Sequence, residues 1–339
     1  MENNILNNEI ISEADENKVE EINEDELFKF VEEDPEASEK ITAPRYSYWK
    51  SVLRVFFRKK SNWVALGILI IMLLLTYIYG STIKTPLSDY TINPNVLVSE
   101  YKNLTPNQAI GEFGFSLKWI LGTGTYGEST LQHIWAGARI SLTLAVICAA
   151  INMTLGVVIG AVWGFSKKVD VVMTEVYNII ANIPYILFVS VFVLVLGPGF
   201  WSFVIALTVT GWLSIAYFIR TQVLIIRDRE YNLASKCLGT GLVKLTTKNI
   251  LPYLTSVIVT ILATEVPSYI SYEVFLSYLG IGMDSNTPSL GKLIQAAQSS
   301  MTIYPIQFWG PVLVSSLLTI ILYVVGQNLA DASDPRTHM

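Results

Sequence analysis

The chain has 339 residues, of which 52% are hydrophobic and only 15% are charged, and its mean hydropathy is +0.46. A soluble domain carries about 25% charged residues, so this composition excludes an ordinary soluble protein and predicts an integral membrane protein. The net charge of −5 conceals an asymmetry, because residues 1–44 hold fifteen Asp and Glu against three Lys, whereas the remainder holds thirteen acids and twenty bases.

The acidic stretch 1–44 is expected to be a disordered cytoplasmic tail, because few apolar side chains are present to offset the entropy of ordering. A docking or regulatory segment would have the same composition. The first apolar run begins only at residue 63, so we expect no signal peptide and a span that stays in the mature protein.

Six apolar segments follow, each near the roughly 20 residues that cross a bilayer as a helix. They are residues 63–79, 140–164, 171–196, 200–219, 253–279 and 308–329, and Pro267 interrupts the fifth. The sequence therefore predicts an all-α membrane protein with six transmembrane helices.

Lys and Arg residues set the expected orientation. With both termini in the cytoplasm, fifteen of these residues lie on the cytoplasmic side and five lie outside. The predicted organisation is a basic juxtamembrane segment and first helix (45–80), an extracellular segment (81–136), a five-helix transmembrane domain (137–331) with a cytoplasmic loop at 228–250, and a cytoplasmic C-terminus (332–339).

That cytoplasmic loop contains a predicted short helix beginning near Glu230. Tyr231, Ala234, Cys237 and Leu238 recur at spacings of three and four and so share one face. Gly239 and Gly241 suit a helix end and a turn. A docking helix and an ordinary connecting loop with a lipid-facing helix both fit this pattern.

The loop resembles the cytoplasmic "EAA" loop of bacterial ABC importer permeases, whose pattern is E-A-A, three residues, Gly, and later Leu-Pro. The matching residues are Leu233-Ala234-Ser235, Gly239 and Leu251-Pro252, preceded by Arg229-Glu230-Tyr231. The usual Glu is replaced by Leu233, and the second Ala by Ser235.

Three further blocks resemble the oligopeptide/dipeptide (and nickel) branch of this family, so the likeness covers roughly residues 45–339. Block 121–142 matches a G-A-R-x-S-L segment, but Gly124, Glu128 and Ser129 stand where Asp, Arg and Asp are usual. Block 271–293 keeps the E-x-x-L-S … P-S-x-G pattern, and block 326–336 keeps the closing D-P-R.

The resemblance implies a type I ABC importer permease in the bacterial cytoplasmic membrane. It implies as partners a second homologous permease, two cytoplasmic ATPases, an extracellular peptide-binding protein, a peptide substrate and lipid, with no nucleic acid. ATP-driven closure of the ATPases would move the loop and switch the permeases between inward-open and outward-open states. The residues so assigned to ATPase coupling are Arg229, Glu230, Tyr231, Ala234, Ser235, Lys236, Leu238, Gly239 and Thr240.

The chain is not expected to be an enzyme. It contains no G-x-x-x-x-G-K-[ST] phosphate loop, so ATP and Mg²⁺ belong to the partner subunits and no cofactor is expected in this chain. It also presents no nucleophile–base pair or metal-ligand cluster, since His133 and His338 lie far apart, and a disulfide between Cys148 and Cys237 is not expected.

Three acidic residues fall within the predicted spans, where burial in lipid is costly. Glu175 lies near Lys167 and Lys168 and is expected to be solvated or paired. Glu265 and Glu273 either line a polar translocation path or gate, or form structural hydrogen bonds between helices, and Arg139 is a candidate ion-pair partner of Glu273.

Three other functions remain open. Import of nickel or another small solute fits the same family, because the binding protein selects the substrate in such systems. A secondary transporter without an ATPase would show an inverted repeat with broken helices, and a simple membrane anchor would leave the 228–250 loop unexplained.

Overall fold

A computed structural model describes residues 47–82, 101–124, 127–284 and 287–334. The chain divides into two compact units, 1–46 and 47–339, and the structure described here belongs to the second. The predicted acidic tail and about a third of the predicted extracellular segment therefore lie outside the described residues.

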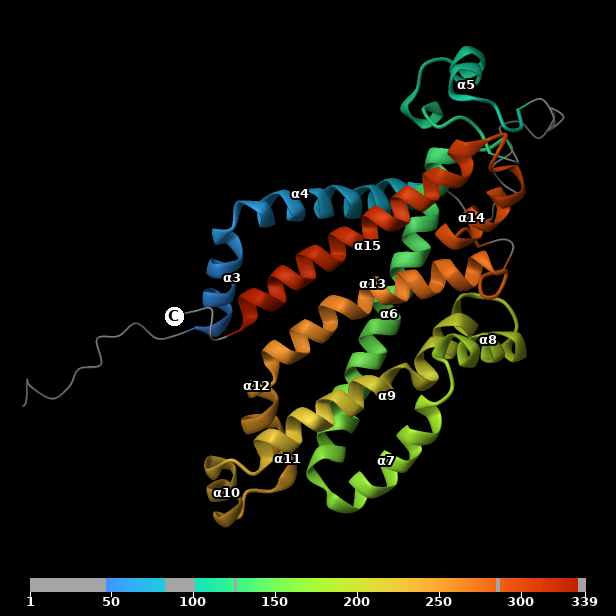
Figure 1. Ribbon diagram of the computed structural model, residues 1–339. Helices are drawn as coiled ribbons and strands as arrows, with labels where there is room; N and C mark the ends of the chain where they lie inside the picture. Colours follow the sequence, from blue (N-terminus) through green and yellow to red (C-terminus); the bar gives the residue numbers. More distant parts are fainter. Residues whose placement is uncertain (1–46, 83–100, 125–126, 285–286, 335–339) are drawn as a thin grey trace, which may run out of the picture. The chain divides into compact units, whose positions relative to one another are not determined.

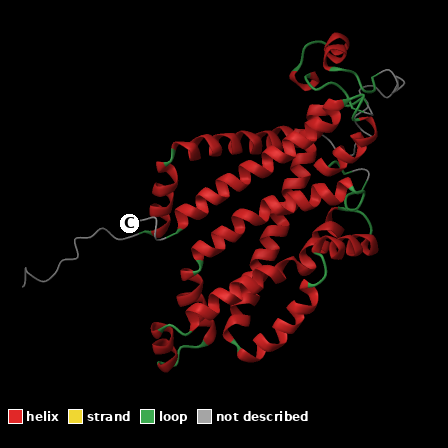
Figure 2. Cartoon of the chain, in the orientation of Figure 1, coloured by secondary structure: helices red, strands yellow, loops and turns green. Residues whose placement is uncertain are grey.

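Helices joined by loops make up these residues, with one isolated β-bridge between Thr123 and Ser129 (Figure 2). The α-helices are α3 (Tyr48–Arg58), α4 (Lys60–Leu74), α5 (Pro106–Phe113), α6 (Thr130–Phe165), α7 (Lys167–Ala181), α8 (Tyr185–Leu196), α9 (Phe200–Arg227), α10 (Glu230–Cys237), α11 (Leu242–Leu245), α12 (Leu251–Tyr253), α13 (Thr255–Tyr278), α14 (Leu290–Ala297) and α15 (Pro305–Ser333). A π-helical turn, Leu75–Tyr79, extends α4, and another, Thr246–Ile250, joins α11 to α12.

Among the described residues, five helical segments are long and apolar enough to cross a membrane: Lys60–Tyr79, α6, α9, α13 and α15. The predicted third span is not one straight helix. It is the pair α7 and α8, which meet at an angle of 83°. Pro184 lies at the break and explains it, because proline lacks a backbone N–H and disfavours helical geometry in the residue before it. By length and composition, the described residues thus hold five candidate spans, or six if this bent pair is one.

Two of the helices, α6 and α9, extend well past one predicted end. Helix α6 begins at Thr130, ten residues before the predicted start, and the Ser129 hydroxyl caps it by accepting from the Gln132 N–H at 3.3 Å. Its 36 residues measure about 54 Å, against about 30 Å of hydrocarbon. Helix α9 continues to Arg227 rather than residue 219. Both helices therefore extend beyond the membrane core.

Helices α6 and α9 pack closely because glycines recur every fourth residue on α6. A Cβ placed on Gly156 would lie 2.6 Å from the Ile215 Cβ, and one on Gly164 would lie 2.7 Å from the Val223 Cβ. A Cβ on Gly160 would collide with the carbonyl oxygen of Ala216. Small residues at this spacing let membrane helices approach closely where no hydrophobic effect drives them together.

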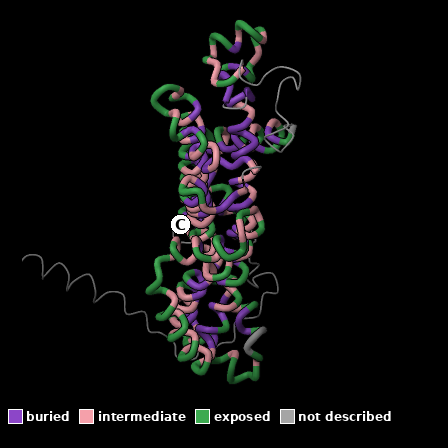
Figure 3. The backbone as a smooth tube through the Cα atoms, turned by 90° about the vertical axis from the view of Figure 1, so that its right-hand side faces the viewer, coloured by how far each residue is buried: buried purple, intermediate pink, exposed green. Residues whose placement is uncertain are grey.

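Large apolar side chains remain exposed along the outer faces of the long helices. Val195 of α8 is 79% exposed and Leu194 is 71% exposed, and none of the residues of α7 is buried. Exposed and buried residues alternate along the helices (Figure 3). A continuous apolar exterior of this kind is suited to contact with lipid chains or other membrane helices.

The short helices gather at the two ends of the long ones (Figure 1). Helix α3 and the α10–α12 segment lie at one end, where α9 finishes and α15 also ends. Helices α5 and α14 lie at the opposite end. The predicted coupling segment and the predicted extracellular segment are therefore separated by the length of the helical bundle.

Candidate functional site

The segment 230–241 forms a short helix with a defined end. Helix α10 spans Glu230–Cys237, as the sequence spacing predicted. Gly239 has a φ of +79°, its N–H donates to the Lys236 carbonyl at 2.9 Å, and the Thr240 N–H donates to the Ser235 carbonyl at 3.0 Å. These two bonds form a Schellman motif, which terminates the helix and favours glycine at the left-handed position.

One side of α10 is fixed to the bundle through Asn232, which is fully buried. The Asn232 amide donates to the carbonyl of Ile226 at 2.9 Å, in the last turn of α9. The amide of Asn249 donates to the Asn232 side-chain oxygen at 3.2 Å and to the Ser235 hydroxyl at 3.4 Å. The end of α9, which precedes α10, and the segment with Asn249, which follows it, are thereby both hydrogen-bonded to α10.

The opposite side of α10 is exposed, and we call it the docking face: Tyr231, Ala234, Cys237 and Leu238. The Leu238 side chain is 87% exposed and that of Tyr231 is 48% exposed. Leu233, which stands in place of the usual Glu, is also exposed at 44%. An apolar surface on a short, anchored helix is suited to contact with another protein.

The remaining predicted coupling residues surround this face. Arg229, Glu230, Lys236 and Gly239 are exposed, while Ser235 and Thr240 are partly buried. The Lys236 ammonium lies 5.4 Å from the centre of the Phe165 ring, at the end of α6. Sequence reasoning missed Asn232 and Asn249. The sequence feature that could have indicated them is an Asn side chain near each end of the loop, next to an apolar segment.

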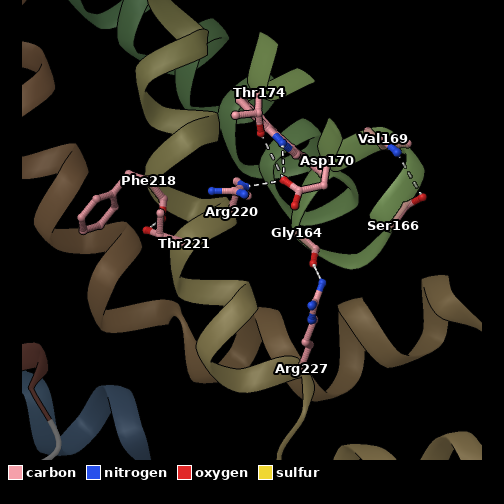
Figure 4. Close-up of polar contacts among 10 residues, drawn as sticks. Gly164, Ser166, Val169, Asp170, Thr174, Phe218, Arg220, Thr221 and Arg227 are labelled. Atoms are coloured by element: carbon pink, nitrogen blue, oxygen red, sulfur yellow. Dashed lines mark hydrogen bonds and ion pairs between the residues drawn. The ribbon is translucent and has the colours of Figure 1, made fainter. Parts of the chain in front are cut away.

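A polar cluster joins the end of α6, the start of α7 and the last turns of α9 (Figure 4). The Asp170 carboxylate lies 2.6 Å from Nε of Arg220 and accepts a 2.9 Å hydrogen bond from the Trp163 indole. The Arg227 guanidinium donates to the Gly164 carbonyl at 2.8 Å. The rings of Tyr177 and Tyr217 stack 4.1 Å apart in the same region.

This cluster supports α10 indirectly. It fixes α7 to α9 and the last turns of α9 to α6. Helix α10 is in turn hydrogen-bonded to the end of α9 through Asn232. The sequence analysis did not predict it, because Asp170 and Arg220 are fifty positions apart and nothing in the sequence pairs them. Glu175 lies on α7, and among the described residues it forms no ion pair with Lys167 or Lys168.

Glu273 is fully buried where two of the sequence blocks meet. The Ser141 hydroxyl, from the first block, donates to its carboxylate at 2.5 Å, and the Ser277 hydroxyl donates at 2.9 Å. Ser141 also accepts the Leu290 N–H at 3.1 Å, at the start of α14. The carboxylate thus holds α6, α13 and α14 together.

The predicted ion pair between Arg139 and Glu273 does not form in the described structure. Arg139 lies two residues before Ser141 on α6, so its side chain leaves the helix in another direction, about 200° away. Serines on α6 and α13 occupy the carboxylate instead. This arrangement favours a structural role for Glu273 between helices over a place on an open pathway.

Glu265 is half-buried on α13, one helical turn before Tyr269 and within reach of its hydroxyl. The amide of Asn152 on α6 donates to the Tyr269 hydroxyl at 2.5 Å, and the Tyr185 hydroxyl donates to the Leu207 carbonyl at 2.7 Å. Four helices therefore contribute to a polar cluster inside the apolar bundle. An Asn within a membrane helix was the available signal for it.

The substitutions in the first block also have a structural explanation. Ser129 caps α6, and the Glu128 carboxylate occupies the space that a side chain at Gly124 would need. Glu128 lies 3.4 Å from Nδ1 of the buried His133. The Glu128 carboxylate thus lies beside position 124, where the family pattern has an Asp. His133 has an acidic neighbour that the sequence did not predict.

The fold and the anchored 230–241 segment define a polytopic helical membrane protein with a short, exposed helix fixed at one end of the bundle. Residues 152–339 match the family described as "Binding-protein-dependent transport system inner membrane component", and residues 47–106 match "N-terminal TM domain of oligopeptide transport permease C". The chain belongs to the family of inner membrane components of binding-protein-dependent transport systems.

Two relatives show the extent of the similarity. The oligopeptide transport system permease protein AmiD of Streptococcus pneumoniae is 46% identical over 313 residues, covering 92% of this chain and 98% of that protein. The dipeptide transport system permease protein DppC of Lactococcus lactis is 32% identical over 326 residues, covering 89% and 94%. The similarity therefore extends over nearly the whole length of both relatives.

Proposed function

We propose that this chain is a permease subunit of an ATP-driven importer of oligopeptides or dipeptides. The observation that carries the proposal is the 46% identity to an oligopeptide permease over nearly the full length of both chains. The relatives' names specify peptides, which favours a peptide over nickel or another small solute.

In this proposal the chain forms half of the transmembrane pathway, and a second homologous permease forms the other half. Two cytoplasmic ATPase subunits supply the energy, and an extracellular binding protein delivers the peptide. Both termini and α10 lie on the cytoplasmic side, as the distribution of Lys and Arg indicates. The docking face, with Leu238 at its tip, contacts the ATPase.

The geometry of α10 supports the coupling role. Its Asn232 side is bound to α9 and its Leu238 side is free, so movement of an attached ATPase would pass to α9 through hydrogen bonds already present. The link works if the ATPase binds α10 more tightly in one state of the permease than in the other.

The test is uptake of a labelled short peptide by cells that lack the gene, or that carry the native chain, Leu238→Asp or Leu238→Met at equal membrane levels. Leu238 makes little contact within the chain, so its replacement by Asp should leave the fold intact. We expect uptake to require the chain, to fall at least tenfold with Asp and to persist with Met. Unchanged uptake in cells without the gene would refute the peptide proposal. Full uptake with Leu238→Asp would refute the coupling role alone.

A further inference from the structure

Helix α3, which precedes the first span, is fixed to the bundle along one stripe. Val52 and Phe56 are buried against residues of α15 that include Ala332. The Tyr48 hydroxyl donates to the Ser333 carbonyl at 2.7 Å. The position of α3 is therefore set by packing and by a hydrogen bond to the end of α15.

The corner between α3 and α4 is also fixed. Lys59 has extended backbone angles, so the chain turns there and α3 runs across the direction of α4 (Figure 1). The buried Asn62 amide donates to the Phe56 carbonyl at 2.7 Å, and the Trp63 indole donates to the Phe57 carbonyl at 3.1 Å. These bonds satisfy carbonyls at the end of α3 that the helix leaves free. If the segment Lys60–Tyr79 crosses the membrane, as its length and composition allow, α3 runs along the membrane surface.

The rest of α3 is exposed in two adjoining stripes. Trp49 and Leu53, 55% and 50% exposed, form an apolar stripe one turn apart. Lys50, Arg54 and Arg58 are four residues apart and form a basic stripe beside it, and all three are exposed. Within the described part of the chain, no acidic side chain forms an ion pair with these three bases.

The apolar stripe continues onto the lipid-facing side of α4. The ring centres of Phe57 and Trp63 lie 4.7 Å apart, and Trp63 is 58% exposed at the start of the span. Tryptophans at this level are typical of the boundary between headgroups and hydrocarbon. With Trp63 at that boundary, the basic stripe on α3 would stand at the height of the phosphate groups.

We propose that α3 is an interfacial helix that binds anionic phospholipid headgroups through Lys50, Arg54 and Arg58. A helix with one apolar and one basic face lies in the headgroup region, and its affinity rises with the anionic lipid content. The paired stripes and the fixed corner favour lipid over a soluble partner, because they align the bases with the membrane surface. Bound anionic lipid would also stabilise the end of α15, because the Tyr48–Ser333 hydrogen bond joins it to α3.

The test compares lipid retention by the purified full-length chain in mild detergent containing equal phosphatidylglycerol and phosphatidylcholine, measured by native mass spectrometry. Arg54→Gln/Arg58→Gln removes two charges from the basic stripe. Lys167→Gln/Lys168→Gln removes two exposed charges from α7 and serves as the matched control. We expect the native chain and the control to retain phosphatidylglycerol in preference to phosphatidylcholine. In the α3 variant, the ratio of retained phosphatidylglycerol to phosphatidylcholine should be about tenfold lower.

Equal retention by the two double variants, or no preference in the native chain, would overturn the proposal. Coupling with a carbodiimide in phosphatidylglycerol vesicles gives a second measurement, since it joins lysines to nearby carboxylates. Absence of a protein cross-link at Lys50 is expected. An amide between Lys50 and an acidic residue of 1–44 would assign the basic stripe to that segment and exclude lipid as its occupant.

Discussion

The Ser141 hydroxyl donates a 2.5 Å hydrogen bond to the Glu273 carboxylate, joining residues 132 positions apart on α6 and α13. Ser277 donates to the same carboxylate, and the N–H of Leu290 donates to Ser141. A buried acid with such partners is costly to disturb, because each hydroxyl left without a partner keeps its full desolvation penalty.

Glu273 should therefore tolerate an amide better than a deletion of its polar end. We expect Glu273→Ala to lower the free energy of unfolding by about 1–3 kcal/mol, and Glu273→Gln to cost less, since the amide oxygen still accepts from a serine. Thermal unfolding of the purified chain in detergent measures both. Equal losses for Ala and Gln would contradict the hydrogen-bonding role.

Double-mutant cycles separate the two candidate partners of Glu273. Pairing Glu273→Ala with Ser141→Ala should give a coupling energy of about 1 kcal/mol or more, whereas pairing it with Arg139→Ala should give one near zero. The same unfolding assay applies. A large coupling to Arg139 would restore the ion pair that the sequence predicted.

Asn232 should be needed for transport although it lies on the buried side of α10. Asn232→Ala removes the bonds to the Ile226 carbonyl and Asn249, and we expect peptide uptake to fall at least tenfold while the membrane level of the chain changes little. Asn249→Ala leaves the Ile226 bond intact and should have a smaller effect. Native uptake by Asn232→Ala at a normal membrane level would show that α10 needs no anchor to α9.

Replacement by alanine should have different effects at two glycines, one at the contact of α6 with α9 and one on the open side of α4. Gly160→Ala would force a Cβ against the Ala216 carbonyl, so we expect a loss of about 1–3 kcal/mol in unfolding free energy. Gly67→Ala on α4 is the control, because no atom lies within 4 Å of its added Cβ, and it should be neutral or slightly stabilising. A neutral Gly160→Ala would show that α6 and α9 are not in close contact.

Arg220 should not be replaceable by lysine. Its Nε bonds Asp170, and its guanidinium lies 5.8 Å from the Trp163 ring centre, an arrangement that a lysine ammonium does not reproduce. Because both partners are partly exposed, we expect a coupling energy on the order of 1 kcal/mol between Arg220→Lys and Asp170→Asn in a thermal-unfolding cycle. No coupling in that cycle would reduce the cluster to an incidental surface contact.

The sequence predicted the helices well where long apolar runs decide the structure, and it predicted α10 and its glycine end from local spacing. It missed one local signal, because the break between α7 and α8 lies at Pro184, within a segment predicted as one span. It failed where distant residues decide the structure, because nothing in the local sequence indicates the packing of α3 against α15 or the pairing of Asp170 with Arg220. Arg139 was chosen for its charge, whereas packing placed Ser141 against Glu273.

The uninterrupted length of α9 has a mechanical consequence. Its 28 residues extend about 42 Å. At the far end the Gly199 N–H donates to the Gly282 carbonyl at 2.9 Å, in the loop after α13, and at the near end the Ile226 carbonyl accepts from Asn232. A regular helix resists stretching along its axis, so α9 is a rigid connection between the contacts at its two ends. A displacement of α10 would therefore be transmitted along the backbone of α9 to Gly282, and no side chain between them would need to change its rotamer.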